Sequence, residues 1–202
     1  TAAAAMRRYL AATRPGAGLD VPPTDPAYGA YLNWLHMSDA TLTFPQTLVL
    51  RYGRFEPAER QQPQVVVDYT RWFLARLRAV ESAVAHNDHL CAGRFTAADV
   101  AVGYALLLAQ HLGLAAQFGP ATQAYWQRLQ ARPGYQRAMA AQTRAAEEQG
   151  VPTTPAPDTQ PCRPALFPHN PAMERPACSN DSSVSRHWLC RSRHWHSRNP
   201  RW

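Results

Sequence analysis

The sequence predicts an all-α fold, a helical bundle over its first 150 residues followed by a disordered C-terminal tail. Three observations predict it. Apolar residues recur every three or four positions in several segments of residues 1–150. No segment of that region shows the alternation expected of a half-buried strand. Hydrophobic residues make up 46% of the chain, which is enough to build a core.

The first elements are a short helix and a linker. Residues 1–13 are rich in Ala, a strong helix former, and Pro15-Gly16 ends this segment. Because the helix begins without a cap, we expect it to be the end of a longer structure. Residues 14–24 are rich in Pro and Gly and predict a linker.

The main helical domain is expected over residues 25–148. Asp25-Pro26 suits a helix start, since Asp caps and Pro fits the first turn, and Pro45 should kink or end that helix. Further helices are expected over 64–85, over the apolar stretch that follows Asp99, over 120–130 and over 134–148.

The stretch Phe95-Thr96-Ala97-Ala98-Asp99-Val100 has the pattern of a capped helix start. Thr96 and Asp99 match the capping box, in which the side chain of each residue accepts a hydrogen bond from the backbone N–H of the other. Phe95 and Val100 have the spacing of a hydrophobic staple. A catalytic acid at Asp99 is the alternative, but no second carboxylate or His lies near it in sequence, so the structural interpretation is favoured.

Charge and cysteine content bound the kind of protein. The net charge is +7, and all 21 basic residues are Arg. Residues 1–150 hold 14 Arg and 11 acids, a surplus of +3, which is weak evidence for a nucleic-acid partner. Cys91 is the one cysteine of that region and sits without a base nearby in sequence, so we expect an ordinary thiol in a reducing compartment. No apolar run is long enough to predict a membrane span.

Residues 149–202 form a Pro-, Arg- and Trp-rich tail, for which several interpretations stay open. It is disordered chain without function, or a nucleic-acid contact through Arg and Trp. A zinc site is a third interpretation, although the spacing fits no standard pattern; it would use Cys190, His187, His194 or His196. The abrupt change of composition favours a fourth, an out-of-frame translation.

Four segments together resemble the glutathione S-transferase family. Phe-Thr-x-Ala-Asp before a buried helix, AYWQRLQARPGYQRAM (Ala124–Met139) and AYLNWLHMSDATLTFP are similar to the C-terminal helical domain of that family. RRYLAATRPGAGL is similar to the end of its thioredoxin-like domain. The resemblance covers roughly residues 1–145 and makes residues 1–13 the remnant last helix of a thioredoxin-like domain.

The resemblance implies a dimeric, cytoplasmic enzyme that conjugates glutathione, its co-substrate, to small electrophilic molecules. In the family the thioredoxin-like domain holds glutathione and activates its thiol, and almost all of that domain is missing here. The acid-Ser pair of the family should fall near Ala2-Ala3 and is not there. We therefore expect a fragment or degraded copy of a transferase that binds no cofactor or metal and is inactive alone.

The helical domain of the family supplies much of the electrophile pocket. The residues assigned to substrate binding by this resemblance are Met37, Thr41, Phe44, Leu48 and Tyr52, which step along the first helix of the domain. Ordinary core or interface residues are the alternative for them. For the chain as a whole, the alternative is a non-enzymatic protein-interaction module of the same helical fold.

Overall fold

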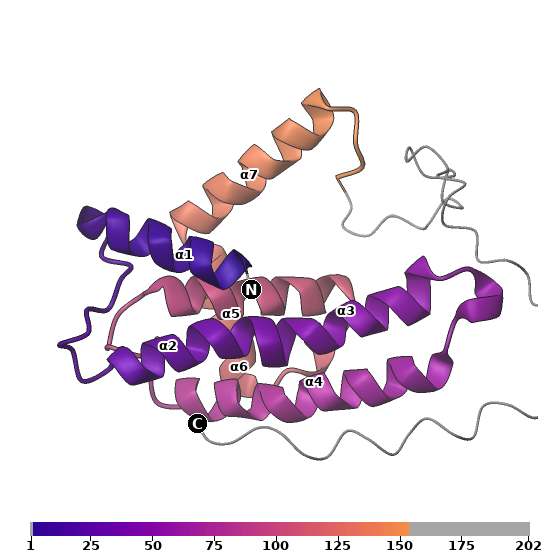
Figure 1. The fold of residues 1–202 in the computed structure, drawn as a ribbon, viewed down its shortest axis with the longest axis horizontal. Helices are drawn as coiled ribbons and strands as arrows, with labels where there is room; N and C mark the ends of the chain where they lie inside the picture. The colour runs from indigo at the N-terminus through magenta and orange to yellow at the C-terminus, as the bar shows by residue number, and fades with distance from the viewer. Residues whose placement is uncertain (1, 154–202) are drawn as a thin grey trace, which may run out of the picture. The chain divides into compact units, whose positions relative to one another are not determined.

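The computed structural model describes residues 2–153, and these residues contain helices and no strand (Figure 1). The all-α prediction is therefore confirmed for this part of the chain. The α-helices are α1 (Ala2–Thr13), α2 (Tyr28–Met37), α3 (Phe44–Leu50), α4 (Pro63–Val84), α5 (Ala97–His111), α6 (Pro120–Ala131) and α7 (Pro133–Glu148). The tail from residue 154, with its nucleic-acid and zinc hypotheses, lies outside the described residues.

Residues 28–55 form one uninterrupted helical run, in which α-helical and π-helical segments alternate. We call these residues the helical run. A π-helical segment, Ser38–Thr43, joins α2 to α3, and a second, Arg51–Phe55, follows α3. Pro45 has no N–H to donate, which would interrupt a regular α-helix. The π segment takes up this change just before Pro45, where the N–H of Phe44 donates to the carbonyl of Asp39. The helix therefore neither ends nor breaks at Pro45.

The start of α2 differs from the prediction. Asp25 does not cap the helix: α2 begins at Tyr28, and Ala27 occupies the N-cap without a side-chain hydrogen bond. The Asp25 carboxylate accepts the N–H of Ala27 at 2.8 Å, and its carbonyl accepts that of Tyr28 at 2.9 Å. Asp stabilises such turns as well as helix starts, so the sequence signal marked a turn directly before the helix.

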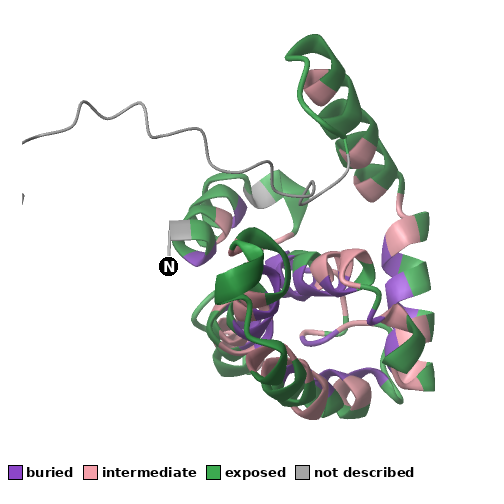
Figure 2. Ribbon diagram, turned by 90° about the vertical axis from the view of Figure 1, so that its right-hand side faces the viewer, coloured by how far each residue is buried: buried purple, intermediate pink, exposed green. Residues whose placement is uncertain are grey.

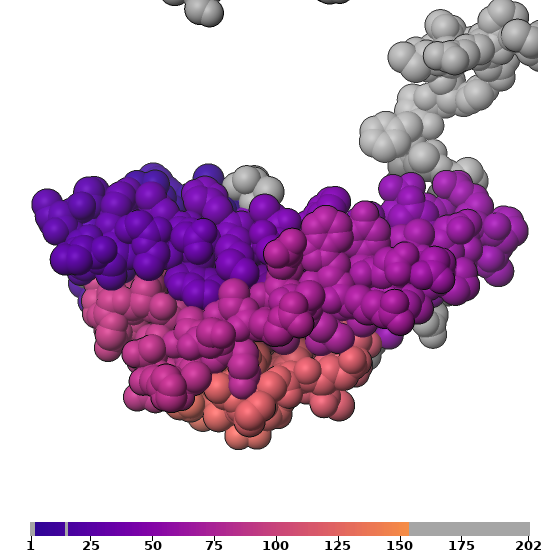
Figure 3. All heavy atoms as spheres, turned by 90° about the horizontal axis from the view of Figure 1, so that it is seen from below, coloured from indigo at the N-terminus to yellow at the C-terminus, as the bar shows by residue number. Residues whose placement is uncertain are grey.

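The core lies between this helical run, α4, α5 and α6. Figure 2 shows buried residues on the inward faces of these helices. The largest fully buried side chains include Trp126, Tyr31, Tyr125, Phe73 and Leu35. α4 lies between the helical run and α6 (Figure 3), and it turns Phe73, Leu77, Val80 and Val84 inward. These four residues follow the predicted helical spacing.

Residues 14–24, predicted as a linker, are fastened to the start of α5. The Arg94 guanidinium donates to the carbonyl oxygens of Gly18 and Asp20, the latter at 2.7 Å. The N–H of Ala97 donates to the carbonyl of Leu19 at 2.9 Å, and Val21 is fully buried. These contacts fix the path of the chain between α1 and α2.

α1 packs against α5 and leaves its other face exposed. Ala4 and Ala11 are buried, and Arg7 forms an ion pair with Asp39 at 2.5 Å. The exposed large apolar side chains of this helix are Met6, Tyr9 and Leu10. Among the described residues, no helix is both long and apolar enough to cross a membrane.

α7 extends away from the bundle and carries no buried residue (Figures 1 and 2). It ends in a Schellman motif, in which Gly150 adopts a left-handed conformation with φ of 62° and the N–H of Val151 donates to Ala146 at 3.0 Å. α5 ends in the same way at Gly113, with the N–H of Leu114 donating to Ala109 at 2.9 Å.

Candidate functional site

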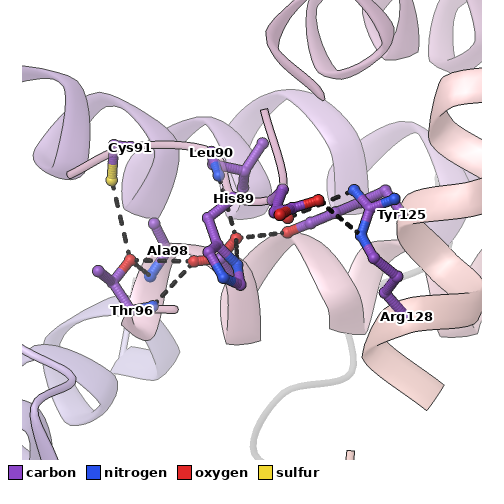
Figure 4. A network of polar contacts seen from close by, with 9 residues as sticks. His89, Leu90, Cys91, Thr96, Ala98, Tyr125 and Arg128 are labelled. Atoms are coloured by element: carbon purple, nitrogen blue, oxygen red, sulfur yellow. Dashed lines mark hydrogen bonds and ion pairs between the residues drawn. The ribbon is translucent and has the colours of Figure 1, made fainter. Parts of the chain in front are cut away.

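Asp99 is fully buried, and its carboxylate accepts hydrogen bonds from Leu90, Thr96 and Tyr125. Figure 4 labels these three partners and draws the hydrogen bonds as dashed lines. Its Oδ2 accepts the N–H of Thr96 at 2.8 Å and the Thr96 hydroxyl at 3.2 Å. Its Oδ1 accepts the N–H of Leu90 at 3.1 Å and the Tyr125 hydroxyl at 2.8 Å. Four donors therefore hold one carboxylate that has no contact with solvent.

Thr96 and Asp99 form the capping box of α5. Both halves of the box are present, and Thr96 Oγ1 also accepts the N–H of Ala98 at 3.2 Å. These bonds satisfy N–H groups that have no partner within the helix. Phe95 is partly buried and Val100 is 43% exposed, so their direct contact as a staple stays a prediction.

The network joins three parts of the bundle. Leu90 belongs to the loop before α5, Thr96 and Asp99 begin α5, and Tyr125 lies on α6. A general acid must reach the proton that it transfers, directly or through one water. A carboxylate that is fully buried among four protein donors supports a structural role for Asp99.

Burial raises two pKa values around Asp99. Burial raises the pKa of Tyr125 far above its usual range, and the charge of Asp99 acts in the same direction. Burial also raises the pKa of the Cys91 thiol, while the hydrogen bond with Thr96, at 3.8 Å from Sγ to Oγ1, opposes this change. Because the thiolate is the reactive form, Cys91 is a poor nucleophile at neutral pH.

Folding brings His89 beside Asp99, although the two are ten positions apart in sequence. His89 Nδ1 lies 3.9 Å from Asp99 Oδ1 and forms no hydrogen bond with the described residues. The His89 and Phe95 rings pack edge to face, with their centroids 6.2 Å apart and their planes at 72°. The 3.9 Å between His89 Nδ1 and Asp99 Oδ1 is longer than a hydrogen bond, so the two side chains are neighbours without a direct hydrogen bond. The described residues also contain no group of three or more His, Cys, Asp or Glu that could hold a metal ion.

A groove of about 550 Å³ lies between the helical run and α4, and we call it the α2–α4 groove. It is lined by Asn33, His36, Met37, Ala40, Thr41, Trp72, Ala75, Arg76 and Ala79. Trp72 is 47% exposed and stacks on Tyr69, with ring centroids 5.5 Å apart. Three alanines and a flat indole make this surface suited to contact with another surface.

The five predicted substrate-binding residues separate in the structure. Met37 and Thr41 line the α2–α4 groove, whereas Phe44, Leu48 and Tyr52 do not. The π segment Ser38–Thr43, which contains Thr41 and ends directly before Phe44, has more residues per turn than an α-helix, so an α-helical spacing does not keep one face across it. Phe44 is 51% exposed, and the Tyr52 ring lies 5.3 Å from the Arg51 guanidinium.

A second groove, of about 370 Å³, lies along α5, α6 and the start of α7, and we call it the α5–α7 groove. Its lining includes the predicted staple residues Phe95 and Val100, and the buried Asp99. Nothing in the sequence pattern predicted this groove, because it depends on where α7 lies relative to α5 and α6.

Glu81 is a structural residue that the sequence analysis missed. From α4, its carboxylate accepts the N–H of Ala121 at 3.0 Å and of Thr122 at 2.7 Å, at the first turn of α6. A signal was present, because α6 begins at Gly119-Pro120 without a capping side chain of its own. A helix start without a local cap requires a partner from elsewhere in the chain.

The fold is similar to solved glutathione transferases. A bacterial glutathione S-transferase, BphK, solved as a ternary complex, gives a TM-score of 0.60 at 20% identity, over 68% of this chain and 66% of that chain. Ure2p5 from Phanerochaete chrysosporium, cocrystallised with 1-(S-glutathionyl)-2,4-dinitrobenzene, gives 0.63 at 18% identity, over 72% and 69%. A glutathione transferase from Methylococcus capsulatus gives 0.57 at 25% identity, over 68% and 65%.

No protein-family model and no curated protein matches the sequence. The chain spans about two thirds of the length of the solved structures that it matches. The three solved structures named above are glutathione transferases, and the described part of this chain is helical. This chain therefore has the fold of the glutathione S-transferases. Its described residues are helical, as expected of the C-terminal domain of that fold.

Proposed function

We propose that this chain is the helical part of a glutathione S-transferase-like protein that conjugates glutathione to small electrophilic molecules. The observation that carries the proposal is the likeness to solved transferases, one of them cocrystallised with a glutathione conjugate. In conjugation, the glutathione thiol loses its proton to solvent, its sulfur forms a bond to the electrophilic carbon, and the leaving group departs with its electron pair. Glutathione is then the co-substrate of the whole protein, and this chain contributes binding surface.

The chain supplies part of the wall of the electrophile pocket. Phe44 and Leu48 lie one turn apart on α3, and both side chains are accessible, Phe44 to 51%. Such a pair offers an apolar surface to a small aromatic molecule. Tyr52 follows one further turn along the helical run and adds a ring with a polar tip.

The chain also supplies part of a homodimer interface, which we assign to the α2–α4 groove. Met37 and Thr41 lie in it, so we assign them to the edge between this interface and the electrophile wall. Exposed Trp72 is the kind of residue that dominates binding energy at protein interfaces. Ala40, Ala75 and Ala79 leave room for a partner helix to approach closely.

We place the protein in the cytoplasm. The support is the single cysteine of residues 1–150, which is buried and unpaired, as is usual in a reducing compartment.

The experiment uses the full chain with reduced glutathione and 1-chloro-2,4-dinitrobenzene. We expect no conjugation above the spontaneous rate, but saturable binding of 1-(S-glutathionyl)-2,4-dinitrobenzene in calorimetry. Phe44→Ala should weaken that binding about three- to tenfold, which corresponds to about 0.7–1.4 kcal/mol. Phe55→Ala is the matched control, since Phe55 is also exposed, at 43%, but lies beyond the proposed wall.

Two outcomes contradict the proposal. Absence of binding, or equal weakening by Phe44→Ala and Phe55→Ala, contradicts the assignment of Phe44 to the electrophile wall. Retention on glutathione resin together with conjugation shows that the chain holds and activates glutathione by itself, against the expectation that it is inactive alone.

A non-enzymatic interaction module is the second candidate. Exposed Trp72, which stacks on the half-buried Tyr69, favours it, since Trp and Tyr are enriched among the residues that dominate protein-binding surfaces. Capture of a partner protein that Trp72→Ala abolishes, with no binding of the glutathione conjugate, would support the module over the transferase.

A further inference from the structure

The α5–α7 groove is a mostly apolar depression with a floor and two walls. Trp126 and Leu129 of α6 form the floor, and Gly103 opens it, because a Cβ atom at Gly103 would lie 3.2 Å from Leu129 Cδ1. Val100, Tyr104 and Leu107 of α5 line one wall. Tyr135, Ala138 and Met139 of α7 line the other.

One cationic side chain lies in this groove. The Arg132 guanidinium lies over the Phe95 ring, 3.5 Å from its centroid, which holds the plane of the guanidinium in place. No carboxylate of residues 2–153 forms an ion pair with Arg132. The one carboxylate in the lining, Asp99, is occupied by its four donors. The N–H donors of the Arg132 guanidinium therefore remain available to an anion.

The start of α7 adds to this positive charge. Arg132 is the N-cap of α7, and no side chain caps that helix start. The first N–H groups of a helix have no partner within it and favour negative charge. Gly134, in the first turn of α7, also lines the groove.

From this combination we propose that the α5–α7 groove binds a small organic acid, an apolar chain or ring that carries one carboxylate. The carboxylate pairs with Arg132 at the start of α7, and the apolar body lies between Val100 and Tyr104 on one side and Met139 on the other. The site is built from α5, α6 and α7, so the inference goes beyond the function proposed above and does not depend on it.

The size of the groove favours a small molecule over a helix of a partner protein. A volume of about 370 Å³ lies in the range of small-molecule sites, which begins at about 300 Å³. A helix is about 10 Å across and could place only single side chains in it. An acid with a slender apolar body instead fits along the floor of the groove, and its carboxylate reaches Arg132 at the start of α7.

The test measures binding of decanoate to the full chain by calorimetry, with decanol as the neutral probe of the same length. Decanoate should bind more tightly than decanol. Arg132→Gln should weaken decanoate about three- to tenfold and leave decanol within about twofold. Arg137→Gln is the matched control, because it removes the same charge from an exposed position of α7 outside the groove.

A second pair of variants tests the groove itself. Ala138→Phe fills it from the exposed wall and should abolish binding of both probes, while Ala140→Phe, on an exposed position outside the lining, should leave binding intact. Circular dichroism of each variant verifies that the helices are retained.

Three results would overturn the proposal. The first is no decanoate binding, or binding that neither Arg132→Gln nor Ala138→Phe changes. The second is a dimer in sedimentation that Ala138→Phe converts to monomer, because the groove is then covered by a second copy. The third is at least tenfold tighter decanoate binding after removal of residues 154–202, because the chain then covers its own groove.

Discussion

A Cβ atom on Gly119 would lie 2.4 Å from Cδ of Glu81, so the glycine leaves the space that this carboxylate occupies. Glu81 belongs to α4, and its carboxylate bonds the N–H groups of Ala121 and Thr122 at the start of α6. The N-cap position of α6 has no side chain of its own, and a carboxylate from a neighbouring helix replaces it. The pair therefore both caps α6 and joins it to α4.

Gly119→Ala should lower the free energy of unfolding by about 1–2 kcal/mol, the usual effect of losing a cap. Gly119 has a φ of −64°, which Ala also adopts, so the loss comes from displacing Glu81 and not from the backbone. Denaturant unfolding measures it. Gly134→Ala is the control: nothing lies within 4 Å of its Cβ position, and Ala should leave stability equal or slightly higher. Equal stability of Gly119→Ala and the wild type would contradict the prediction.

The same carboxylate predicts a dependence of stability on pH. Burial by itself raises the pKa of Glu81, but the hydrogen bonds from Thr122 and Ala121 outweigh it, and the net pKa is lowered. Because the folded pKa lies below the unfolded value of about 4.3, the stabilisation is present above that value and is lost as pH falls through the folded pKa.

Glu81→Gln should therefore reduce the loss of stability on acidification. Melting temperatures measured from about pH 7 to about pH 3 should fall less steeply for this variant than for the wild type. Glu59→Gln, an exposed glutamate of a short 3₁₀ turn, controls for the change in net charge. Parallel curves for wild type and Glu81→Gln would rule out this linkage.

Asp99→Ala should lower the free energy of unfolding by about 2–4 kcal/mol in total, which is more than the loss of a helix cap alone. It leaves the N–H of Leu90 and the hydroxyl of Tyr125 without an acceptor, and both lie in the core. Tyr125→Phe removes one donor and keeps the ring, so it should cost about 1–2 kcal/mol. Unfolding of the two single variants and the double variant measures the coupling. Fully additive effects would contradict the hydrogen bond between them.

Local signals in the sequence predicted most helix limits. Thr96 and Asp99 mark the start of α5, and the helix expected from residue 120 begins at Pro120, because each residue type satisfies or relieves a backbone group at that place. The π segment at Ser38–Thr43 could not be predicted in this way. It adds residues to a helical turn without changing the composition of the segment.

Contacts between distant segments were the other part that could not be predicted. Tyr125 of α6 is fully buried and donates to Asp99, but no pattern in the sequence names Asp99 as its partner. Which side chains of two helices meet depends on the point and the angle at which the helices pack. A single sequence does not specify either. The separation of Met37 and Thr41 from Phe44 has a different origin, the π segment Ser38–Thr43, in which Thr41 lies.

Arg94→Gln should free the segment between α1 and α2. Arg94 donates to two carbonyl oxygens of that segment, while the neighbouring hydrogen bond from Ala97 to Leu19 depends on the segment staying in place. We expect hydrogen exchange at the Ala97 N–H to become about tenfold faster, which corresponds to about 1.4 kcal/mol of local opening. Exchange in the middle of α4 serves as the internal control. Unchanged exchange at Ala97 would show that the segment holds without Arg94.

Removal of residues 154–202 should leave the helical circular dichroism per molecule nearly unchanged. Every described helix ends by Glu148, and the Schellman motif that closes α7 uses residues only as far as Val151. Gly150→Ala is the comparison, because Ala is strained at a φ of 62° and should fray the last turn of α7. A loss of helical signal on removal that exceeds the loss in Gly150→Ala would mean that residues 154–202 support helices beyond the end of α7.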